Sequence, residues 1–324
     1  MVRSLRIIFS LLGFFSLSAI ASFANPLVYG GQYYPEEFVL KQIPEVWTKY
    51  GLDVEHILFS SGADSDQALI SGQIQINCGS DSRTASLLSA IPDEGIILAT
   101  IQKGDRYATV VSPSSSFSDW NDLKGQMIAV RLGTGAEQIL RRFFAQDPNL
   151  AWEDFKWVNL KIEDMIPSLQ AGRIAAFTAW EPTCGIAEAQ GAGKILKTYG
   201  EISTVPVSLH TTRAYAENNR DIIIRFLAAH LEKVALIESN PEEAAKLAAE
   251  YSNKTGFTVQ PEAFISIFKR INFSLDVTEK DLESIKDTAK MLHDGGQIAN
   301  LPNIVYDPSY LEEAKKLYEE KKTN

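Results

Sequence analysis

The chain has 324 residues, of which 45% are hydrophobic, and its formal net charge is −10 at pH 7. Such an acidic balance argues against nucleic acid or an anionic membrane as the partner, because both are bound through basic surfaces. The length is sufficient for about two domains with substantial cores.

The first 24 residues have the features of a signal peptide that is removed on export. Arg3 and Arg6 precede an apolar run from Ile7 to Ile20, and Ser22-Phe23-Ala24 places small residues where a signal peptidase cleaves. The run is short for a membrane span, and no cysteine follows it that could carry a lipid. Removing two of the 31 basic residues leaves 29 against 41 acidic ones, a net charge of −12. We therefore predict a soluble, exported protein without a lipid anchor.

The mature chain begins with strands, Gly/Ser turns and helices in alternation. Strands are predicted over Leu27–Gln32, Leu52–Phe59 and Ile74–Cys78. A helical pattern over residues 35–50 joins the first two, and another over residues 64–70 joins the second and third. This alternation favours a parallel α/β sheet.

The central part of the chain continues in the same way, and the last third is helical. Further strands are predicted over Ile96–Gln102, Tyr107–Val111, Met127–Val130, Trp157–Leu160, Ile174–Trp180, Lys194–Thr198 and Val205–Thr211. The segments Leu69–Ile74 and Leu169–Ile174 resemble each other, as expected of two related lobes. From Asn218 onward the apolar spacing is that of helices, and His230 lies on an apolar stripe where a core histidine is expected.

The sequence gives little support for a catalytic, nucleotide-binding or metal-binding motif. The turn Gly133-Thr134-Gly135 has two glycines of a dinucleotide fingerprint, but Gln138 stands at the third and no acid ends the next strand. The four histidines are far apart, and none has metal-ligand spacing to another ligand. No Gly-x-Ser-x-Gly elbow is present. We therefore expect no catalytic residues, no cofactor and no metal. Cys78 and Cys184 are interpreted as buried thiols, with a disulfide left open.

A binding site for a small molecule has more support. In open α/β sheets, ligands bind at the carboxyl ends of strands, where polar turns meet helix N-termini. Four such turns follow predicted strands here, and a tryptophan ends a fifth. They are Gln32-Tyr33-Tyr34, Ser60-Ser61-Gly62, Gly79-Ser80-Asp81, Gly133-Thr134-Gly135 and Trp180-Glu181. We expect these turns to supply N–H donors, hydroxyls and aromatic walls to one cleft.

At this point the chain resembles the periplasmic solute-binding proteins of ABC importers. The most similar branch is the one named for the fungal thiamine-pyrimidine synthase, together with the sulfonate, taurine and nitrate receptors. The resemblance rests on the order and spacing of short motifs over nearly all of the mature chain. These are Gly51-Leu52-Asp53-Val54, Phe59-Ser60-Ser61-Gly62, Ser71-Gly72, Asp122-Leu123-Lys124-Gly125, Gly133-Thr134-Gly135, Leu169-Gln170-Ala171-Gly172, Ala179-Trp180-Glu181-Pro182 and Asn240-Pro241-Glu242-Glu243-Ala244.

The resemblance implies an α/β fold of type II, with two lobes joined by a hinge that closes on a ligand in the cleft between them. Lobe one would comprise residues 25–112 and 206–324, and lobe two residues 113–205, with crossings near Val111–Ser114 and Ser203–Pro206. It also implies a monomer that passes its solute to an ABC permease in the inner membrane. The matching site residues are Gln32, Tyr33, Ser61, Gly62, Ser80 and Asp81 from lobe one, and Thr134, Gly135, Trp180 and Glu181 from lobe two.

The ligand itself stays open between two chemical classes. An anion of the sulfonate, taurine or nitrate type would use N–H and hydroxyl donors, with Arg83 and Arg131 as the few basic candidates. Tyr29, Tyr33, Tyr34 and Trp180 could instead stack on a pyrimidine of the thiamine-precursor type. Two other functions are also kept: a sensing module that signals to a membrane partner, and an exported enzyme.

Overall fold

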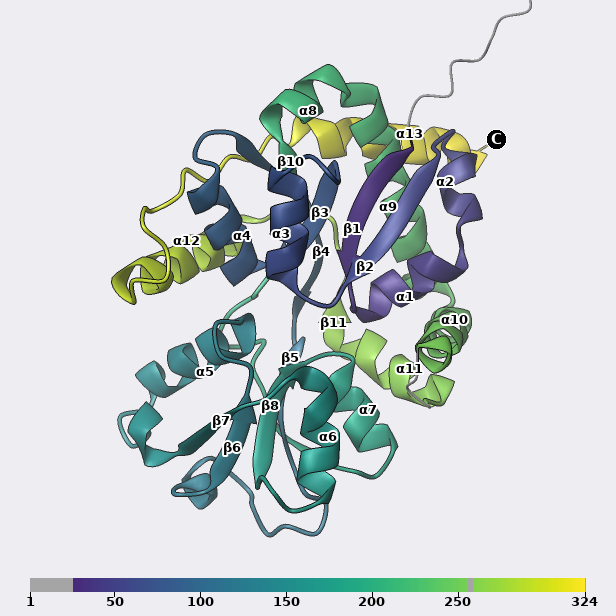
Figure 1. The fold of residues 1–324 in the computed structure, drawn as a ribbon. Helices are drawn as coiled ribbons and strands as arrows, with labels where there is room; N and C mark the ends of the chain where they lie inside the picture. Colours follow the sequence, from purple (N-terminus) through teal and green to yellow (C-terminus); the bar gives the residue numbers. More distant parts are fainter. Residues whose placement is uncertain (1–25, 256–258, 324) are drawn as a thin grey trace, which may run out of the picture.

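The computed structural model describes residues 26–255 and 259–323, so the predicted signal peptide lies outside the described residues. Two separate sheets, each covered by helices, divide the described chain into two lobes (Figure 1). We call the six-stranded sheet and its helices the first lobe, and the five-stranded sheet and its helices the second lobe. The mixed α/β class expected from the strand and helix pattern is confirmed.

The first sheet has the strand order β11-β4-β10-β3-β1-β2. Its strands are β1 (Leu27–Gln32), β2 (Val54–Phe59), β3 (Ile76–Ser80), β4 (Gly95–Gly104), β10 (Val207–Thr212) and β11 (Ile271–Asn272). β1 pairs in parallel with β2 and β3, whereas β10 runs antiparallel between β3 and β4. The carboxyl ends of β1, β2 and β3 therefore meet at one edge of the sheet.

The second sheet has the order β7-β6-β8-β5-β9. Its strands are β5 (Tyr107–Val111), β6 (Met127–Val130), β7 (Lys156–Asn159), β8 (Ala176–Trp180) and β9 (Lys194–Thr198). β6 pairs in parallel with β7 and β8, and β5 is antiparallel to β8 and β9. Trp180, at the end of β8, lies opposite Tyr107 at the start of β5.

The helices of the first lobe come from both ends of the chain. They are α1 (Pro35–Gln42), α2 (Glu45–Lys49), α3 (Gly62–Ile70), α4 (Asp81–Ala90), α8 (Arg213–Asn218), α9 (Arg220–Ser239), α10 (Pro241–Lys254), α11 (Pro261–Arg270), α12 (Glu279–Asp294) and α13 (Ser309–Thr323). The second lobe has α5 (Gly135–Gln146), α6 (Ile162–Gln170) and α7 (Thr183–Ala189), with the short 3-10 turns η1 (Asn121–Leu123) and η2 (Trp152–Asp154). Among the described residues, no helix has both the length and the apolar character needed to cross a membrane.

The helical pattern over residues 35–50 is divided into two helices in the structure. α1 ends at Gln42 and α2 begins at Glu45, with Pro44 between them. Proline has no N–H to donate and disfavours helical geometry in the residue before it, here Ile43. The single helix expected from the apolar spacing is therefore wrong at this point.

The chain passes between the sheets through two neighbouring segments. The first is 105–106, between β4 and β5, and the second is 199–206, between β9 and β10. They are bonded to each other, because Gly104 N–H donates to Thr204 O at 2.8 Å and Gly200 N–H donates to the Asp105 carboxylate at 2.5 Å. Since β5 belongs to the second sheet, the first crossing lies before residue 107 and not near residues 111–114. The exact lobe bounds otherwise stay a prediction.

The two similar sequence segments form the same turn, one in each lobe. Gly72 and Gly172 end α3 and α6 with positive φ angles of 76° and 65°. Their N–H groups donate to Leu69 O and Leu169 O, both at 3.0 Å. The strands that follow begin at Ile76 and Ala176, two residues later than predicted, because each turn continues past the glycine. The internal resemblance therefore has a structural counterpart in each lobe.

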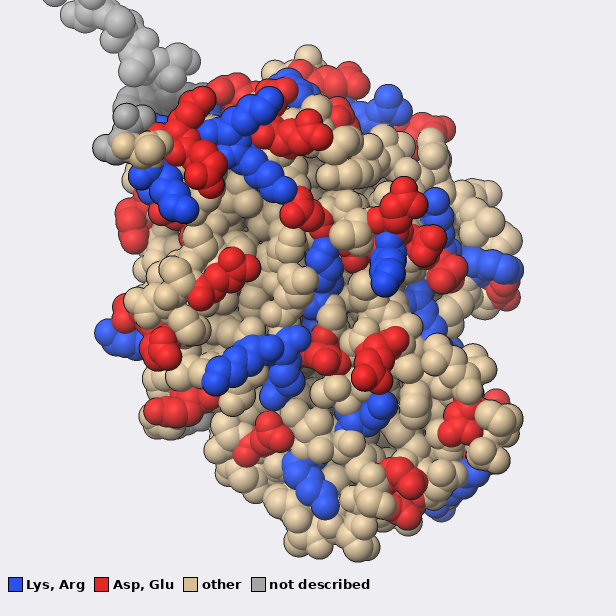
Figure 2. All heavy atoms as spheres, turned by 180° about the vertical axis from the view of Figure 1, so that it is seen from behind, with Lys and Arg blue, Asp and Glu red and all other residues tan. Residues whose placement is uncertain are grey.

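Both cysteines are free and fully buried, Cys78 in β3 of the first lobe and Cys184 in α7 of the second. His230 is also buried, among Tyr29, Trp47 and Phe226, as expected of a core histidine. On the face shown in Figure 2, acidic and basic side chains are interspersed. That face has no extended basic patch.

Candidate functional site

The polar turns of the first lobe come together where β1 and β3 end. The Gln32 amide donates to Cys78 O at 2.6 Å and accepts from the Tyr34 hydroxyl at 3.3 Å. Gly62 lies against the same amide, since a Cβ atom there would come within 3.2 Å of Gln32 Nε2. Ser80 ends β3 and is buried, with its hydroxyl 3.0 Å from that of Ser82. This arrangement follows from parallel pairing, which brings the strand ends to one edge.

Arg106 is the cation of this region. It lies in the first crossing segment, and only 1% of it is exposed. Its guanidinium is 4.5 Å from the centre of the Tyr107 ring and 5.3 Å from that of the Tyr34 ring, within the range of cation–π attraction. Two of its nitrogen atoms, Nε and Nη1, have no hydrogen-bond partner in the protein. Asp81 also attracts this guanidinium electrostatically. Buried donors without a hydrogen-bond partner are costly, so the guanidinium is suited to a further anion.

Tyr107 brings the lobes together around Arg106. Its hydroxyl touches the first residue of α5, because a Cβ atom on Gly135 would come within 2.1 Å of that oxygen. It also lies within hydrogen-bonding reach of the Ser80 side chain, and its ring meets Trp180 edge-on at 6.5 Å. Burial raises the pKa of Tyr107, so the phenol keeps its proton and can donate a hydrogen bond. Residues of both lobes thus surround one buried polar centre.

Four of the ten predicted site residues therefore contact this centre directly, namely Gln32, Ser80, Gly135 and Trp180, and Gly62 lies against Gln32. Trp180 packs against hydrophobic clusters of both lobes. Three others have local roles. Tyr33 is 37% exposed and meets the Phe38 ring, Ser61 is the N-cap residue of α3, and the Thr134 hydroxyl bonds to Arg131 O and Ala136 N.

The two predicted acids are committed to ion pairs across the lobes. Asp81 begins α4 and faces Arg142 of the second lobe at 3.6 Å. Glu181, after β8, pairs with Arg270 of the first lobe at 2.5 Å and accepts from Gly185 N–H at 2.8 Å. Burial raises the pKa of Glu181, an effect that Arg270 opposes. The carboxylates of Asp81 and Glu181 therefore join the lobes.

The basic candidates chosen from the sequence differ from the one that the structure provides. Arg83 is paired with Asp66, and Arg131 is exposed. Arg106 was missed because the first crossing was expected five residues later, which left this residue inside a presumed lobe. A signal was present in the short polar Gly104-Asp105-Arg106 segment between two strongly apolar strands, the composition of a connection between sheets.

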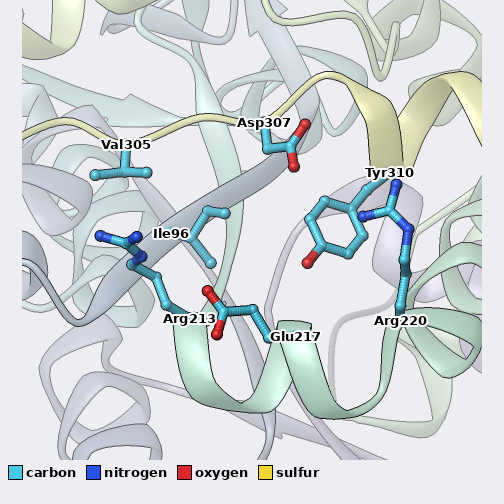
Figure 3. A pocket seen from close by; sticks show the side chains of 7 residues that line it. All are labelled: Ile96, Arg213, Glu217, Arg220, Val305, Asp307 and Tyr310. Carbon is cyan, nitrogen blue, oxygen red and sulfur yellow. The ribbon is translucent and has the colours of Figure 1, made fainter.

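The lobes are closed on each other at this site, and an open cavity lies elsewhere. A cavity of about 360 Å³ is lined by Ile96, Arg213, Glu217, Arg220, Val305, Asp307 and Tyr310 of the first lobe (Figure 3). It is at the amino end of β4, whereas Arg106 follows the carboxyl end of that strand. Within the described part of the chain, no group of His, Cys, Asp and Glu side chains is arranged to hold a metal ion.

Comparison with known proteins decides the family. The family model described as NMT1/THI5 like matches residues 34–244, which is well over half of the chain. The chain belongs to the NMT1/THI5-like family. The matched region of this NMT1/THI5-like protein includes Arg106, Tyr107 and the polar turns from Ser60 onward, but not Gln32 and Tyr33.

Curated relatives of this NMT1/THI5-like protein are named as binding proteins. A putative aliphatic sulfonates-binding protein of Escherichia coli is 25% identical over 197 residues, which is 61% of each chain. The taurine-binding periplasmic protein of Escherichia coli is 25% identical over 268 residues, 78% of this chain and 81% of that one. The match to the first of these thus spans less than two thirds of its length.

A solved structure extends the comparison to the fold. The periplasmic aliphatic sulphonate binding protein SsuA from Escherichia coli superposes with a TM-score of 0.75 at 20% identity, covering 90% of this chain and 92% of that one. This likeness confirms the periplasmic binding protein fold expected from the sequence.

Proposed function

We propose that this protein is the solute-binding component of an ABC importer, which captures a small organic anion between its lobes and delivers it to a permease in the inner membrane. It would act in the periplasm as a monomer, without catalytic activity. The family, and relatives named for binding sulfonates and taurine, support a binding role.

The burial of Arg106 and its free donors are the observation that supports an anionic solute. Arg106 is buried at the meeting point of the lobes, with Nε and Nη1 unpartnered. Removing a guanidinium from water costs several kcal/mol unless an opposite charge and hydrogen bonds compensate. Asp81 and Glu181 already have arginine partners of their own. A sulfonate or carboxylate of the solute would give Arg106 the fork-like pair of bonds that a guanidinium prefers.

The surroundings of Arg106 favour an organic anion over an inorganic one. Tyr34, Tyr107 and Trp180 provide aromatic surface beside the charge. Aromatic walls stabilise an apolar or flat body by contact, which nitrate is too small to use. The anionic alternative is therefore preferred to the uncharged pyrimidine, since a neutral ring offers no anionic acceptor to the two free donors of the buried guanidinium.

Native mass spectrometry of the freshly purified protein, followed by a thermal-shift panel, tests this proposal. The panel comprises alkanesulfonates, taurine, nitrate and thiamine-type pyrimidines. A ligand that binds only the folded state raises the unfolding temperature, and at a fixed concentration a tighter ligand raises it more, because the stabilisation grows with the logarithm of the concentration divided by Kd. We expect a retained organic anion, or stabilisation by sulfonates that nitrate and the pyrimidines do not give.

Stabilisation by the pyrimidines alone would overturn the anionic proposal while leaving the binding role intact. Chemical conversion of the bound solute by the purified protein would overturn the proposal that it has no catalytic activity.

Deletion of the gene separates transport from sensing, because a transport component is needed for uptake of the solute. A sensor would instead change gene expression while uptake continued.

A further inference from the structure

Arg142 reaches from the second lobe into the first. It lies on α5, and only 11% of its side chain is exposed. Its guanidinium donates to Ser284 O at 2.8 Å, to the Ser284 hydroxyl at 3.3 Å and to the Thr288 hydroxyl, all on α12. It also bonds the Ser203 hydroxyl in the second crossing segment at 2.6 Å and faces Asp81 at 3.6 Å.

Asp81 completes this contact from the first lobe. The carboxylate is fully buried and accepts from the Thr288 hydroxyl at 2.6 Å, so its geometry is fixed from its own side. We call Arg142, Asp81, Ser203, Ser284 and Thr288 the α5 clasp.

Arg270 makes a second contact in the opposite direction. It ends α11 in the first lobe and pairs with Glu181 at 2.5 Å and with Glu188 of α7 at 3.6 Å. Beside it the helices are in close contact, because a Cβ atom on Gly185 would come within 2.4 Å of Ile267. We call Arg270, Glu181 and Glu188 the α7 clasp.

The clasps lie on opposite flanks of the crossing segments. In Figure 1, α5 faces α4 and α12 on one flank, whereas α7 faces α11 on the other. Arg106 lies in the crossing segment between them. We propose that the α5 and α7 clasps are the device that holds the lobes closed, so that Arg142 and Arg270 control solute retention and release without touching the solute.

The chemistry of the clasps suits a reversible closure. When the lobes separate, each arginine and each carboxylate regains water, which offsets most of the attraction lost and keeps the difference between the states small. The hydrogen bonds from Arg142 to Ser284 and Thr288 form only when α5 meets α12, so they select one closed geometry. A few kcal/mol of difference between the states is what a ligand needs to shift their populations.

Interlobe distances measured by double electron–electron resonance test the clasps. Spin labels are attached at Gln67→Cys in the first lobe and Lys161→Cys in the second, both exposed positions. The native cysteines are buried and therefore protected from labelling. We expect Arg142→Met with Arg270→Met to move the distance distribution toward longer values, relative to the labelled parent protein with no solute added.

A matched double variant controls for the loss of two positive charges. Arg141 is next to Arg142 on α5 but pairs with Glu137 of the same helix and lies over the Trp152 ring of its own lobe. Lys269 is next to Arg270 and exposed. Arg141→Met with Lys269→Met should leave the distance distribution unchanged.

Should the clasp variant fail to fold, Thr288→Val provides a milder test. It weakens the α5 clasp from the first-lobe side and is expected to give a smaller shift in the same direction.

The clasp proposal rests on the proposed function in one respect, namely that closure of the lobes serves solute capture. The distances report closure without any solute, so the clasp result does not depend on which molecule binds. Identical distributions in the parent protein and the clasp variant would overturn the inference, as would an equal shift in the control variant. If the clasp variant bound solute but kept the interlobe distances of the parent, the clasp proposal would be overturned and the proposed binding function would stand.

Discussion

Gly135 shows at the scale of one residue why α5 must begin with a glycine. A methyl group there would meet the Tyr107 hydroxyl at 2.1 Å and its ring carbon Cζ at 2.9 Å. Real Cβ atoms do not approach other heavy atoms so closely, so Gly135→Ala must displace Tyr107 from its position beside Arg106. Overpacking of this kind costs about 1–3 kcal/mol. We predict a lower unfolding temperature and weaker solute binding, measured by calorimetry.

The double variant Gly135→Ala with Tyr107→Phe is the control, because it removes the oxygen nearest to the new methyl group. Partial recovery of stability relative to Gly135→Ala alone is expected. A Gly135→Ala protein as stable as the parent would contradict the close contact described for Tyr107.

Glu36 makes stability depend on pH. It is fully buried in α1, and neither carboxylate oxygen has a hydrogen-bond partner. Burial raises its pKa from 4.5 to about 8, an effect that Lys233 opposes and Glu37 increases. Between these values the unfolded chain releases a proton that the folded chain retains, so this residue lowers stability as pH rises. Glu36→Gln should remove that loss, measured by urea unfolding from pH 5 to pH 8.

Glu37 is the matched control, since its pKa moves the other way. Although burial pushes its pKa upward, the contact with His56, whose Nε2 lies 2.8 Å from Glu37 Oε2, brings it below the usual value. Glu37→Gln should therefore destabilise the protein at neutral pH instead of flattening the profile. A Glu36→Gln protein with the parent's slope would show that Glu36 is ionised in the fold.

The sequence could identify site residues whose role is indicated by the residues adjacent in the chain. It could not identify residues whose role depends on contacts with the other lobe. Gly135 was found because a glycine before an amphipathic helix is a local pattern. Arg106 was missed because its importance comes from burial between Tyr34 and Tyr107, and burial depends on contacts distant in sequence. Asp81 and Glu181 were found as polar turn residues, but their arginine partners lie 61 and 89 positions away.

The contact between α7 and α11 shows the same dependence at the scale of elements. Gly185 faces Ile267, and a Cβ atom on it would lie 2.4 Å from Ile267 Cγ1 and 3.0 Å from an Arg270 nitrogen. We predict that Gly185→Ala forces the helices apart, lowers the free energy of unfolding by about 1–3 kcal/mol, and weakens the α7 clasp. Urea unfolding provides the measurement.

Combining Gly185→Ala with Ile267→Val removes part of the crowding and should restore part of the difference. Additive effects of the two substitutions would contradict direct contact, because residues that touch show an interaction energy in a double-mutant cycle.

The limits of helices were predicted well where a capping residue is visible in the sequence, and less well where tertiary packing determines the limit. Thr278 was expected to start a helix, and its hydroxyl accepts from Asp281 N–H in a complete capping box. The Asn240 side chain caps α10 by accepting from Glu243 N–H. The order of the strands could not be derived, because β10 enters between β3 and β4 from more than 100 residues along the chain.

At the scale of the whole molecule, two lobes, two crossing segments and two clasps enclose one buried guanidinium. The two-lobed fold was predictable from the repeated helix–glycine–strand unit and from the resemblance to known receptors. The closed packing of the lobes was not, because it depends on Arg142 and Arg270 meeting partners on the opposite lobe.

The most direct test of the proposed function is calorimetric titration of an anionic solute into the parent protein and into Arg106→Met. The solute is the anion found by mass spectrometry, or butanesulfonate if none is retained. Hydrogen bonds to charged groups contribute about 1.5–3 kcal/mol each, so we predict that Arg106→Met weakens binding on the order of 100-fold. Arg131→Met, which removes an exposed arginine near α5, should bind like the parent. Equal affinity of a folded Arg106→Met protein and the parent would contradict the account.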